Sequence, residues 1–412
     1  MTTADGRFDA AVTGIGMVTP AGLGTAASWE RVKAADGTAA GKVPALAGIP
    51  ADFGCGIPDF DPVAAVGKRK AWRLDRSSQF AVAAAVEALA DAGLDPASWD
   101  GARVGVVLGS GIGGATTWEK QHHVLLEQGP QKVSALLIPM LAVNMSAGYI
   151  AMEVGARGPN FVTATACASG ATAIGTAREL LRSGRCDIVI TGGTEACLIP
   201  SIISGFQQMG ALSERRDEPT AASRPFDVDR DGFVAAEGAA VLILERPESA
   251  RARGARIRAN ISGYGASADA YNATAPEPEG TGAELALRAA LDDAGACPDS
   301  VDHVNAHGTS TPLNDLMEAR LIRRVLGDRP AVTSVKGVTG HSLGASGAIE
   351  IAVSALTVEY GLIPPTANLD SQDPEIELDV VSKAARSADV EVAVSNSFGF
   401  GGQNAVVLLT RS

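Results

Sequence analysis

The sequence predicts an α/β protein made of two similar halves, each with a largely parallel sheet. Apolar runs of strand length alternate with helical patterns along most of the chain, as in strand–helix–strand units. A loop that contains glycine and phenylalanine precedes an apolar strand within residues 231–245 and again within residues 397–410. Because each copy closes a segment of alternating strands and helices, we infer an internal duplication. We place the join near residues 246–258 and assign the halves to residues 1–255 and 256–412.

Composition narrows the class of protein. Of the 412 residues, 46% are hydrophobic and 20% are charged, which is ordinary for a globular chain with a sizeable core. The formal net charge of −13 argues against bulk binding of nucleic acid or of an anionic membrane. The five cysteines are an odd number without CxxC spacing, so the sequence indicates neither a zinc site nor a disulfide framework.

The expected location is a reducing cytoplasm. No apolar run approaches the ~18 residues that are needed to span a bilayer. The residues from Met1 to Arg7 lack the apolar segment of a signal peptide. Both observations favour a protein that stays inside the cell.

The first hundred residues open with a predicted strand over residues 10–20 and continue through a Gly- and Pro-rich loop over residues 36–62. A basic island follows at Lys68, Arg69 and Lys70, in an otherwise acidic protein. It is either a solvated helix face or a docking patch for an acidic partner, whose charge would speed association. A helix is then predicted from about residue 77 to residue 93.

The next strand, residues 103–108, runs into a glycine-rich loop that matches G-x-G-x-x-G over residues 109–114. Alone, this motif suggests a dinucleotide-binding turn. The context argues against it, because no strand ending in Asp or Glu follows about 20 residues later, only the helical pattern of residues 121–128. The same glycines suit any loop that must lie close to a ligand or to another backbone.

The stretch around Cys167 predicts a strand, a sharp corner and a helix. β-branched residues mark the strand over residues 161–166, and a helical pattern follows Cys167 and stops at Gly184. Unpaired N–H groups and the positive dipole end at the start of a helix favour a thiolate. Small neighbours leave room for a substrate carbonyl to approach the sulfur. A free cysteine is otherwise often a small buried hydrophobe, so the corner position makes Cys167 a candidate nucleophile.

Two histidines and a lysine follow strand-like runs in the second half. His307 directly follows one such run, and Lys336 and His341 follow the next. Ligands of parallel α/β sheets gather at the carboxyl ends of strands, where Cys167 also lies. We therefore expect one cleft to hold all four side chains.

The other three histidines and one serine motif do not point to a catalytic site. The neighbouring His122 and His123 lie within a helical pattern and are read as surface or packing residues, and His303 lies inside a strand. Residues 340–344 match the G-x-S-x-G motif of serine hydrolases, with Ser342 as the nucleophile. Those enzymes need a histidine after the serine, and no histidine follows His341 in this sequence.

Four ordered motifs resemble the signatures of β-ketoacyl-acyl-carrier-protein synthases of the elongating, Cys-His-His kind, similar to β-ketoacyl-ACP synthase II. The motifs are Thr165-Ala166-Cys167-Ala168-Ser169-Gly170, Asn305-Ala306-His307-Gly308-Thr309-Ser310-Thr311, Lys336-Gly337-Val338-Thr339-Gly340-His341 and Asn396-Ser397-Phe398-Gly399-Phe400-Gly401-Gly402. The resemblance spans nearly the whole chain. It implies the thiolase-like fold, in which two duplicated α/β halves form a five-layer α-β-α-β-α structure, usually as a dimer.

The resemblance also implies a decarboxylative Claisen condensation. In that chemistry Cys167 attacks an acyl thioester on a carrier protein and holds the chain covalently. Malonyl-carrier protein then loses CO2, and its carbanion attacks the Cys167 thioester. The backbone N–H groups of Cys167 and Phe400 would form an oxyanion hole for one thioester oxygen. Neutral His307 and His341 would donate to the malonyl oxygen, with Lys336 helping to keep them in that form.

Further roles carry over by the same resemblance. They are the gating loop (Phe400, Gly399, Gly401) with a second moving loop (Asp269), the substrate-binding positions (Ile112, Thr309, Thr311, Phe398), the supporting carboxylates (Glu350 as the partner of Lys336, Asp315, Glu318) and carrier-protein docking (Lys68, Arg69, Lys70). Ile112 resembles the residue that limits the depth of the acyl pocket, which explains the loop of residues 109–114 without a nucleotide.

No resident cofactor or metal is implied, because the substrates of this family arrive on the phosphopantetheine arm of acyl carrier protein. The expected partners are acyl carrier protein and a second subunit. That subunit completes either a homodimer or a heterodimer with a relative that resembles a chain length factor and lacks the cysteine. Neither nucleic acid nor a membrane is expected as a partner.

The sequence departs from the fatty-acid pattern at several positions. Asn314 stands where that pattern usually has glycine, and residues 340–344, 348–352 and 364–369 look more like type II polyketide ketosynthases. Residues 396–402, in contrast, resemble the fatty-acid synthases. The sequence therefore leans towards polyketide or other specialised chain extension, with housekeeping fatty-acid elongation as the alternative.

Two other classes stay open at this point. A non-catalytic scaffold subunit would keep the fold, but the intact Cys167, His307, His341 and Lys336 count against it. A thiolase-like degradative enzyme would act on coenzyme A esters and normally uses a second cysteine near the C-terminal glycine-rich loop. The last cysteine of this chain is Cys297.

Overall fold

The computed structural model describes residues 8–412, so the prediction for Met1 to Arg7 lies outside the described residues. Its centre is one 12-stranded sheet. The strands from the first half are β1 (Ala10–Thr19), β2 (Gly22–Leu23), β5 (Val104–Gly109), β6 (Asn160–Thr163), β7 (Ile188–Glu195) and β8 (Gly238–Glu245). Those from the second half are β9 (Ala259–Ala268), β10 (His303–Asn305), β11 (Ala331–Thr333), β13 (Asp379–Val380), β15 (Val392–Gly399) and β16 (Gln403–Thr410).

The strand order shows the internal duplication. The first half reads β6-β5-β7-β8-β1 and the second reads β11-β10-β15-β16-β9, so both have the order third, second, fourth, fifth, first. The halves meet where β1 and β9 pair antiparallel at their first residues. The expected boundary at residues 255 and 256 lies between α10 (Pro247–Ala252) and β9.

The expectation of largely parallel sheets is wrong. In each half the third, second and fourth strands are parallel, whereas the fourth pairs antiparallel with the fifth and the fifth with the first. Antiparallel neighbours need no helical crossover, and β15 turns directly into β16 through Gly401 and Gly402. Each half therefore contributes one mixed sheet, and the short β1–β9 pairing joins these two sheets into the 12-stranded array.

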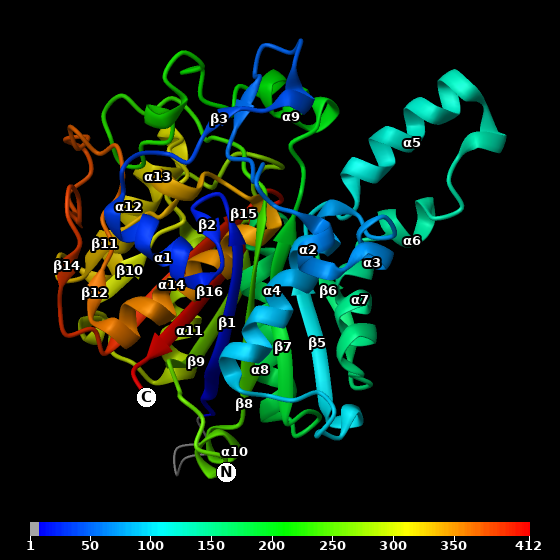
Figure 1. Ribbon diagram of the computed structural model, residues 1–412. Helices are drawn as coiled ribbons and strands as arrows, with labels where there is room; N and C mark the ends of the chain where they lie inside the picture. The colour runs from blue at the N-terminus through cyan, green and yellow to red at the C-terminus, as the bar shows by residue number, and fades with distance from the viewer. Residues whose placement is uncertain (1–7) are drawn as a thin grey trace.

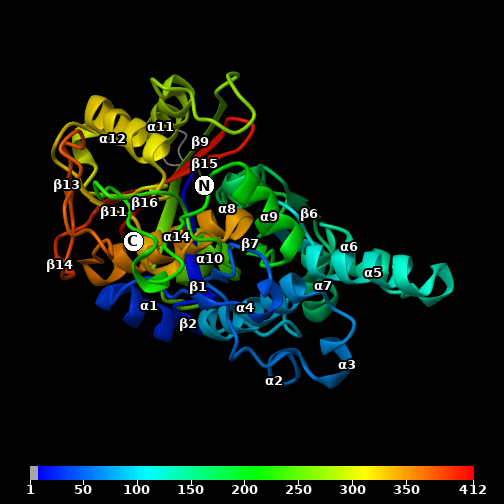
Figure 2. The ribbon, with the colours of Figure 1, turned by 90° about the horizontal axis from the view of Figure 1, so that it is seen from above.

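Helices complete five layers. On the outside of the first half lie α4 (Arg76–Ala92) and α7 (Met145–Val154), and on the outside of the second lie α11 (Thr281–Ala294) and α12 (Pro312–Leu326). Between the sheets, α8 (Ser169–Arg182) packs against α14 (Ser346–Tyr360). Figure 2 shows these layers from above, with α8 and α14 in the middle. The five-layer architecture of two duplicated halves is thus confirmed.

The middle layer is apolar and built from small and branched side chains. Ile174 and Leu181 of α8 and Ile349 and Val353 of α14 are buried in one cluster with residues of both sheets. The four side chains are 0–1% exposed. Burial of this layer from both sides holds the halves in one fixed relation, which matters because each half contributes to the site described below.

The remaining elements connect these layers. They are α1 (Thr25–Ala34), α2 (Pro62–Val66), α3 (Lys68–Ala71), α5 (Ala115–Gln128), α6 (Leu137–Leu141), α9 (Pro200–Gln208), α13 (Lys336–Thr339), and the short strand pairs β3 (Gly41–Lys42) with β4 (Phe53–Gly54) and β12 (Leu362–Ile363) with β14 (Arg386–Ser387). In Figure 1 α5 projects from the body of the molecule. Within residues 8–412, no helix has the length and apolar character that a bilayer crossing requires.

Candidate active site

A cavity of about 500 Å³ brings together three of the four strand-end side chains that the sequence singles out. Cys167, His307 and His341 line it, and Lys336 is buried directly behind His307. Cys167 follows β6 of the first half, whereas both histidines follow strands of the second half. The cleft is therefore formed jointly by the two halves.

The corner at Cys167 is sharper than the sequence predicts. β6 ends at Thr163, and a 3-10 turn over Ala166–Ala168 precedes α8. Ala166 has a φ of 48°, a left-handed conformation that is strained for alanine. The Ser169 hydroxyl holds the turn, since it accepts from the Thr165 N–H at 2.9 Å and donates to the Ala166 carbonyl at 2.6 Å. These bonds replace the last strand pairings and present Cys167 to the cavity.

The thiol of Cys167 is protonated in the resting protein. Burial raises the pKa of Cys167 to about 11, against the lowering effects of the Lys336 ammonium group and of a hydrogen bond from the Phe400 N–H. Desolvation therefore opposes the thiolate, while the Lys336 charge and the Phe400 N–H favour it. The proton must leave as the sulfur attacks.

Lys336 fixes the tautomer of His307. Its ammonium group donates to the His307 carbonyl at 2.6 Å and lies 3.3 Å from the His307 Nδ1. An ammonium group has no acceptor, so Nδ1 must accept and the proton of the neutral imidazole must be on Nε2. Lys336 also forms a buried ion pair with Glu350. The result is an N–H donor at His307 Nε2, the ring nitrogen away from Lys336.

His341 lies beside His307, with ring centroids 5.4 Å apart and rings nearly perpendicular. Its Nδ1 is 2.8 Å from the hydroxyl of Ser346, the first residue of α14. Burial lowers the pKa of both histidines well below the usual value, and the Lys336 charge lowers both further. Both imidazoles are therefore neutral at physiological pH.

Three buried carboxylates surround this site without lining the cavity. Glu318 accepts from the His307 and Gly308 N–H groups, each at 2.8 Å, and so fixes the loop that carries His307. Asp315 accepts from the Phe226 N–H at 3.0 Å and the Ser310 N–H at 3.2 Å. Burial raises the pKa of Asp315, Glu318 and Glu350. All three hold backbone or side-chain donors in place rather than facing a substrate.

The loop from Gly399 to Gly402 lies against the nucleophile. A Cβ on Gly399 would be 2.6 Å from the Thr165 carbonyl oxygen, so only glycine allows this approach. The loop is bonded to the segment of Asp269: the Asp269 N–H donates to the Gly402 carbonyl at 2.9 Å, and the Gly401 N–H donates to the Ala273 carbonyl at 2.8 Å. The two segments expected to move together are thus in contact.

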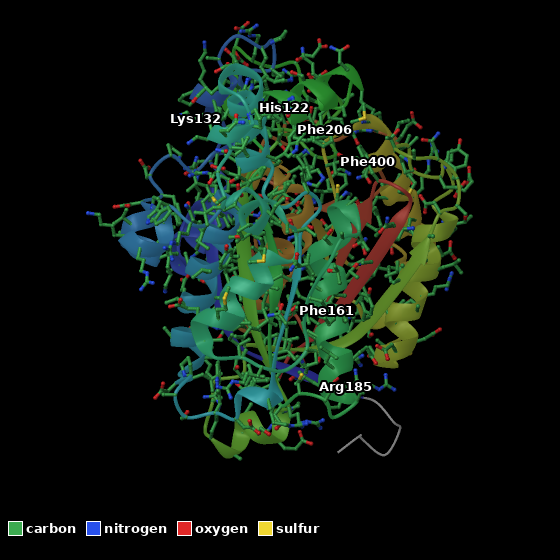
Figure 3. The ribbon with its side chains drawn as sticks, turned by 90° about the vertical axis from the view of Figure 1, so that its right-hand side faces the viewer. His122, Lys132, Phe161, Arg185, Phe206 and Phe400 are labelled. Carbon is green, nitrogen blue, oxygen red and sulfur yellow. The ribbon has the colours of Figure 1, made fainter. Side chains whose placement is uncertain are left out.

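The remaining substrate-binding candidates line the same cavity. These are Ile112, Thr309, Thr311 and Phe398, together with Gly399, Phe400 and Asp269 from the loops above. The hydroxyls of Thr309 and Thr311 are 2.9 Å apart. Phe206, which the sequence does not single out, also lines the cavity, with its ring centroid 6.3 Å from that of Phe400. Figure 3 shows these two rings as neighbours, far above Phe161 of β6.

The basic island lies apart from the residues that line the cavity. Lys68, Arg69 and Lys70 form the exposed helix α3, and Lys70 pairs with Glu153 of α7. Trp72 next to it is 59% exposed, with the Arg73 guanidinium over its ring. The island is therefore a basic and partly apolar surface patch.

The loop of residues 109–114 does not offer a phosphate site. The N–H groups of Gly111, Ile112 and Gly113 point to the carboxylate of Glu195, at 2.7, 3.3 and 3.3 Å. A buried carboxylate in this position repels a phosphate, so the dinucleotide hypothesis is excluded. A sequence signal for Glu195 exists, because it lies at the end of an apolar strand, as Cys167 and His307 lie just after theirs.

The other minor motifs have plain structural settings. The Ser342 Oγ is buried without a hydrogen-bond partner among residues 8–412, so no imidazole activates it there. His122 and His123 are exposed on α5, where His122 stacks on Trp118 at 5.5 Å. His303 is fully buried in β10. The surface interpretation of His122 and His123 and the structural interpretation of His303 are both confirmed.

Two family models match the chain over most of its length. The model described as "Beta-ketoacyl synthase, N-terminal domain" matches residues 8–250. The model described as "Beta-ketoacyl synthase, C-terminal domain" matches residues 258–370.

Curated relatives carry a consistent name. The chain is 47% identical over 355 residues to the "3-oxoacyl-[acyl-carrier-protein] synthase 2" of Synechocystis sp., which covers 85% of each protein. It is 44% identical over 403 residues to the protein of that name from Staphylococcus aureus, which covers 96% of this chain and 99% of the relative.

Solved structures give the same fold. The ishigamide ketosynthase/chain length factor matches with a TM-score of 0.93 and 34% identity, over 98% of this chain and 100% of that one. A type II polyketide synthase acyl-carrier protein in complex with its ketosynthase bound to the hexaketide matches with a TM-score of 0.89 and 32% identity, over 98% and 100%. The thiolase-like fold expected from the sequence is thereby confirmed.

Proposed function

Since the chain belongs to the beta-ketoacyl synthase family of condensing acyltransferases, we propose that it joins an acyl group held on Cys167 to a two-carbon unit from malonyl-acyl carrier protein. The observation that carries this proposal is one cavity in which a cysteine faces two neutral imidazoles. A cysteine holds an acyl group as a thioester, and neutral imidazoles can donate to a developing enolate oxygen.

The first step is acyl loading. The Cys167 sulfur attacks the thioester carbonyl of an acyl-carrier protein, so a sulfur–carbon bond forms at Cys167 and the carrier's thioester bond breaks. The proton of the Cys167 thiol passes to the departing carrier thiolate. The N–H groups of Cys167 and Phe400 are the proposed donors to the carbonyl oxygen, and the Phe400 N–H already donates to the sulfur in the resting protein.

The second step is condensation. The malonyl group loses CO2, and the electron pair of the broken bond forms an enolate. The enolate oxygen accepts from the Nε2–H groups of His307 and His341. For His341 to carry its proton on Nε2, the Ser346 hydroxyl must donate to the His341 Nδ1. The enolate carbon then attacks the carbonyl on Cys167, a carbon–carbon bond forms, and the sulfur–carbon bond at Cys167 breaks. The departing thiolate takes up a proton from water, which balances the loss of the malonyl carboxylate as CO2.

Lys336 acts through His307 in this scheme. It holds Nδ1 of His307 as an acceptor, and its charge disfavours imidazolium at both histidines. Glu350 balances that charge, which makes the buried ammonium group tolerable. Both are therefore positioning residues.

Single-step elongation of the synthase 2 type is the favoured pathway. Identities of 47% and 44% to proteins with that name exceed the 34% and 32% to the polyketide-type chains. Repeated extension in polyketide synthesis is the second candidate. It is favoured by the polyketide-like residues 340–344, 348–352 and 364–369 and by the TM-score of 0.93 to the ishigamide ketosynthase/chain length factor.

Two partners belong to the proposal. Acyl carrier protein would deliver both substrates and dock on the basic patch of α3, where Lys68 and Arg69 are exposed. A second ketosynthase-like subunit would cover the apolar side chains exposed on the projecting α5, among them Trp118, Leu125 and Leu126. The subunit would be a second copy in single-step elongation and a cysteine-less relative in polyketide synthesis.

Intact-mass spectrometry with acyl- and malonyl-carrier proteins tests the proposal. We expect an acyl adduct on the wild type and on the matched control Cys297→Ala, and none on Cys167→Ala. His307→Ala and His341→Ala are expected to load the acyl group but to lose extension by about 100-fold or more, as when one oxyanion donor is removed.

The products separate the two pathways. One extension by the chain alone supports synthase 2-type elongation, whereas repeated extension that requires a cysteine-less partner supports polyketide synthesis. An unacylated wild-type protein would contradict the ketosynthase proposal and revive the scaffold hypothesis.

A further inference from the structure

Glu195, the last residue of β7, is a fully buried carboxylate that the proposed chemistry does not use. Five donors converge on it. They are the N–H groups of Gly111 (2.7 Å) and Gly344 (3.2 Å) to Oε2, and the N–H groups of Ile112 and Gly113 (3.3 Å each) and the hydroxyl of Ser110 (3.1 Å) to Oε1.

These donors come from two loops that are far apart in the sequence. The first follows β5 and carries Ile112, and the second precedes α14 and carries Leu343. Ile112 and Leu343 both line the cavity, and both pack in the apolar cluster that contains Cys167. The Glu195 carboxylate is thus a shared anchor for two walls of the space beside the nucleophile.

The packing around this anchor leaves no room for adjustment. A Cβ on Gly344 would lie 2.4 Å from the Gly111 nitrogen and 2.6 Å from the Glu195 Oε2. The two loops therefore touch through backbone, and their separation is set by the carboxylate between them. Leu343 itself has a φ of 45°, a strained conformation that the surroundings must hold.

We propose that Glu195 is a positioning residue that fixes the Ile112 and Leu343 walls of the acyl pocket and thereby selects the length of the acyl chain on Cys167. This inference rests on the proposed function, because it names the specificity of the same site. Among residues 8–412, the hydrogen bonds of the Glu195 carboxylate all go to the two loops, and its charge reaches Cys167 only through space, where it raises the pKa of the thiol. Its structural effect is therefore on the walls.

The chemistry of the anchor predicts how substitutions behave. Burial raises the pKa of Glu195 to about 7, and the hydrogen bonds from Ser110, Gly111, Ile112 and Gly113 act against that rise because they stabilise the ionised form. The ionised carboxylate is acceptor-only, which suits donors from both loops. The side chain of Glu195→Gln has nearly the same shape but turns one acceptor into an NH2 donor. That donor faces either the Gly111 and Gly344 N–H groups or the Ile112 and Gly113 N–H groups, and the loops must separate.

The test measures acyl transfer to Cys167 from a series of saturated acyl-carrier proteins, short to long. For Glu195→Gln we expect the ratio of kcat/KM between the best and the worst chain length to fall by about tenfold, the effect of losing one charged hydrogen bond. Glu195→Asp keeps an acceptor-only group and is expected to retain a sharp preference, shifted in length.

Glu245→Gln is the matched control. Glu245 is also buried and lies at the opposite end of the β7–β8 ladder, paired with Ile188 where Glu195 pairs with Gly238. We expect it to keep the wild-type length profile. Iodoacetamide labelling of Cys167 checks that each variant keeps an intact nucleophile.

Several outcomes would overturn the inference. An equal loss of activity for every chain length in Glu195→Gln, or an unchanged profile, would show that Glu195 does not select length. If that variant does not fold, an unshifted profile in Glu195→Asp would have the same meaning. A wild-type protein that accepts no acyl group would instead overturn the proposed function, and this inference with it.

Discussion

His303 is a single residue whose burial makes the protein sensitive to acid. Neither of its ring nitrogens has a hydrogen-bond partner among residues 8–412, and burial lowers the pKa of His303 to about 3. The unfolded chain binds this proton near pH 6.5, so between those values the unfolded state holds more protons than the folded state. The contribution of His303 to the free energy of unfolding is therefore fully present above the unfolded pKa and is lost as the pH falls towards the folded pKa.

We predict that His303→Leu removes part of this acid sensitivity. Between about pH 7.5 and about pH 5.5, the free energy of unfolding of the wild type should fall by about 1.4 kcal/mol more than that of the variant. Urea unfolding at both pH values measures the difference. His307 and His341 remain in the variant and keep their own contribution. Equal losses in the two proteins would contradict the prediction.

Some residues of the site can be recognised from their neighbours in the sequence, whereas others have a role that depends on segments far away in the chain. Cys167, His307, His341 and Lys336 could be predicted, because each lies within about ten residues after a strand and carries reactive chemistry. Glu195 has the same signal but was not singled out, since its meaning depends on donors from two distant loops. The effect of burial on the pKa of Cys167 likewise depends on the tertiary structure, because burial is not a local property.

At the scale of elements, α8 ties the two halves together through one buried cation. Arg178 is fully buried and donates to the Ile261 and Ser262 carbonyls of β9, at 3.1 and 2.9 Å, and to Asp293 of α11 at 2.7 Å. Removing the guanidinium leaves two buried carbonyls and a carboxylate without these donors.

We predict that Arg178→Leu lowers the free energy of unfolding by about 3–5 kcal/mol, the cost of breaking a buried pair. Arg182→Leu is the control on the same helix. Arg182 is partly exposed and pairs with the same Asp293 at 3.3 Å. Its loss should cost less than about 1 kcal/mol. Chemical denaturation of both variants tests this, and similar losses would refute the special role of Arg178.

The elements themselves followed from local patterns, and their pairing did not. The predicted helix of residues 77–93 is α4, which ends at Ala92 with Gly93 in a left-handed cap. The predicted strand of residues 161–166 is shorter, because the Ser169 hydroxyl takes over the backbone groups near its end. The antiparallel neighbours were missed, since strand direction depends on how connections cross the sheet.

For the molecule as a whole, the projecting helix α5 carries a group of exposed apolar side chains. Leu126 is 70% exposed there, close to the exposed Trp118 and Leu125. An apolar group of this kind on a projecting helix is typical of an interface. The proposed second subunit would cover it.

We predict that Leu126→Glu weakens association with the second subunit by about tenfold or more, because a charge would be buried at the interface. Analytical ultracentrifugation over a range of concentrations, alone and with a candidate partner, measures the change. Leu285→Glu is the control, since Leu285 is 63% exposed on α11, on the outside of the other half. If only the Leu285 variant dissociates, the interface lies elsewhere.

The duplicated α/β halves, the ordered motifs and the reactive residues near strand ends can all be read from the amino-acid sequence. These features depend on residues that are close together in the sequence, through hydrophobic periodicity, turn residues and side-chain type. Three properties need the folded molecule: the common cavity of Cys167 and the two histidines, the lowered pKa values of both imidazoles, and the bonds of Glu195 to two distant loops. Those properties depend on burial and on distances between segments that meet only when α8 and α14 pack together between the sheets.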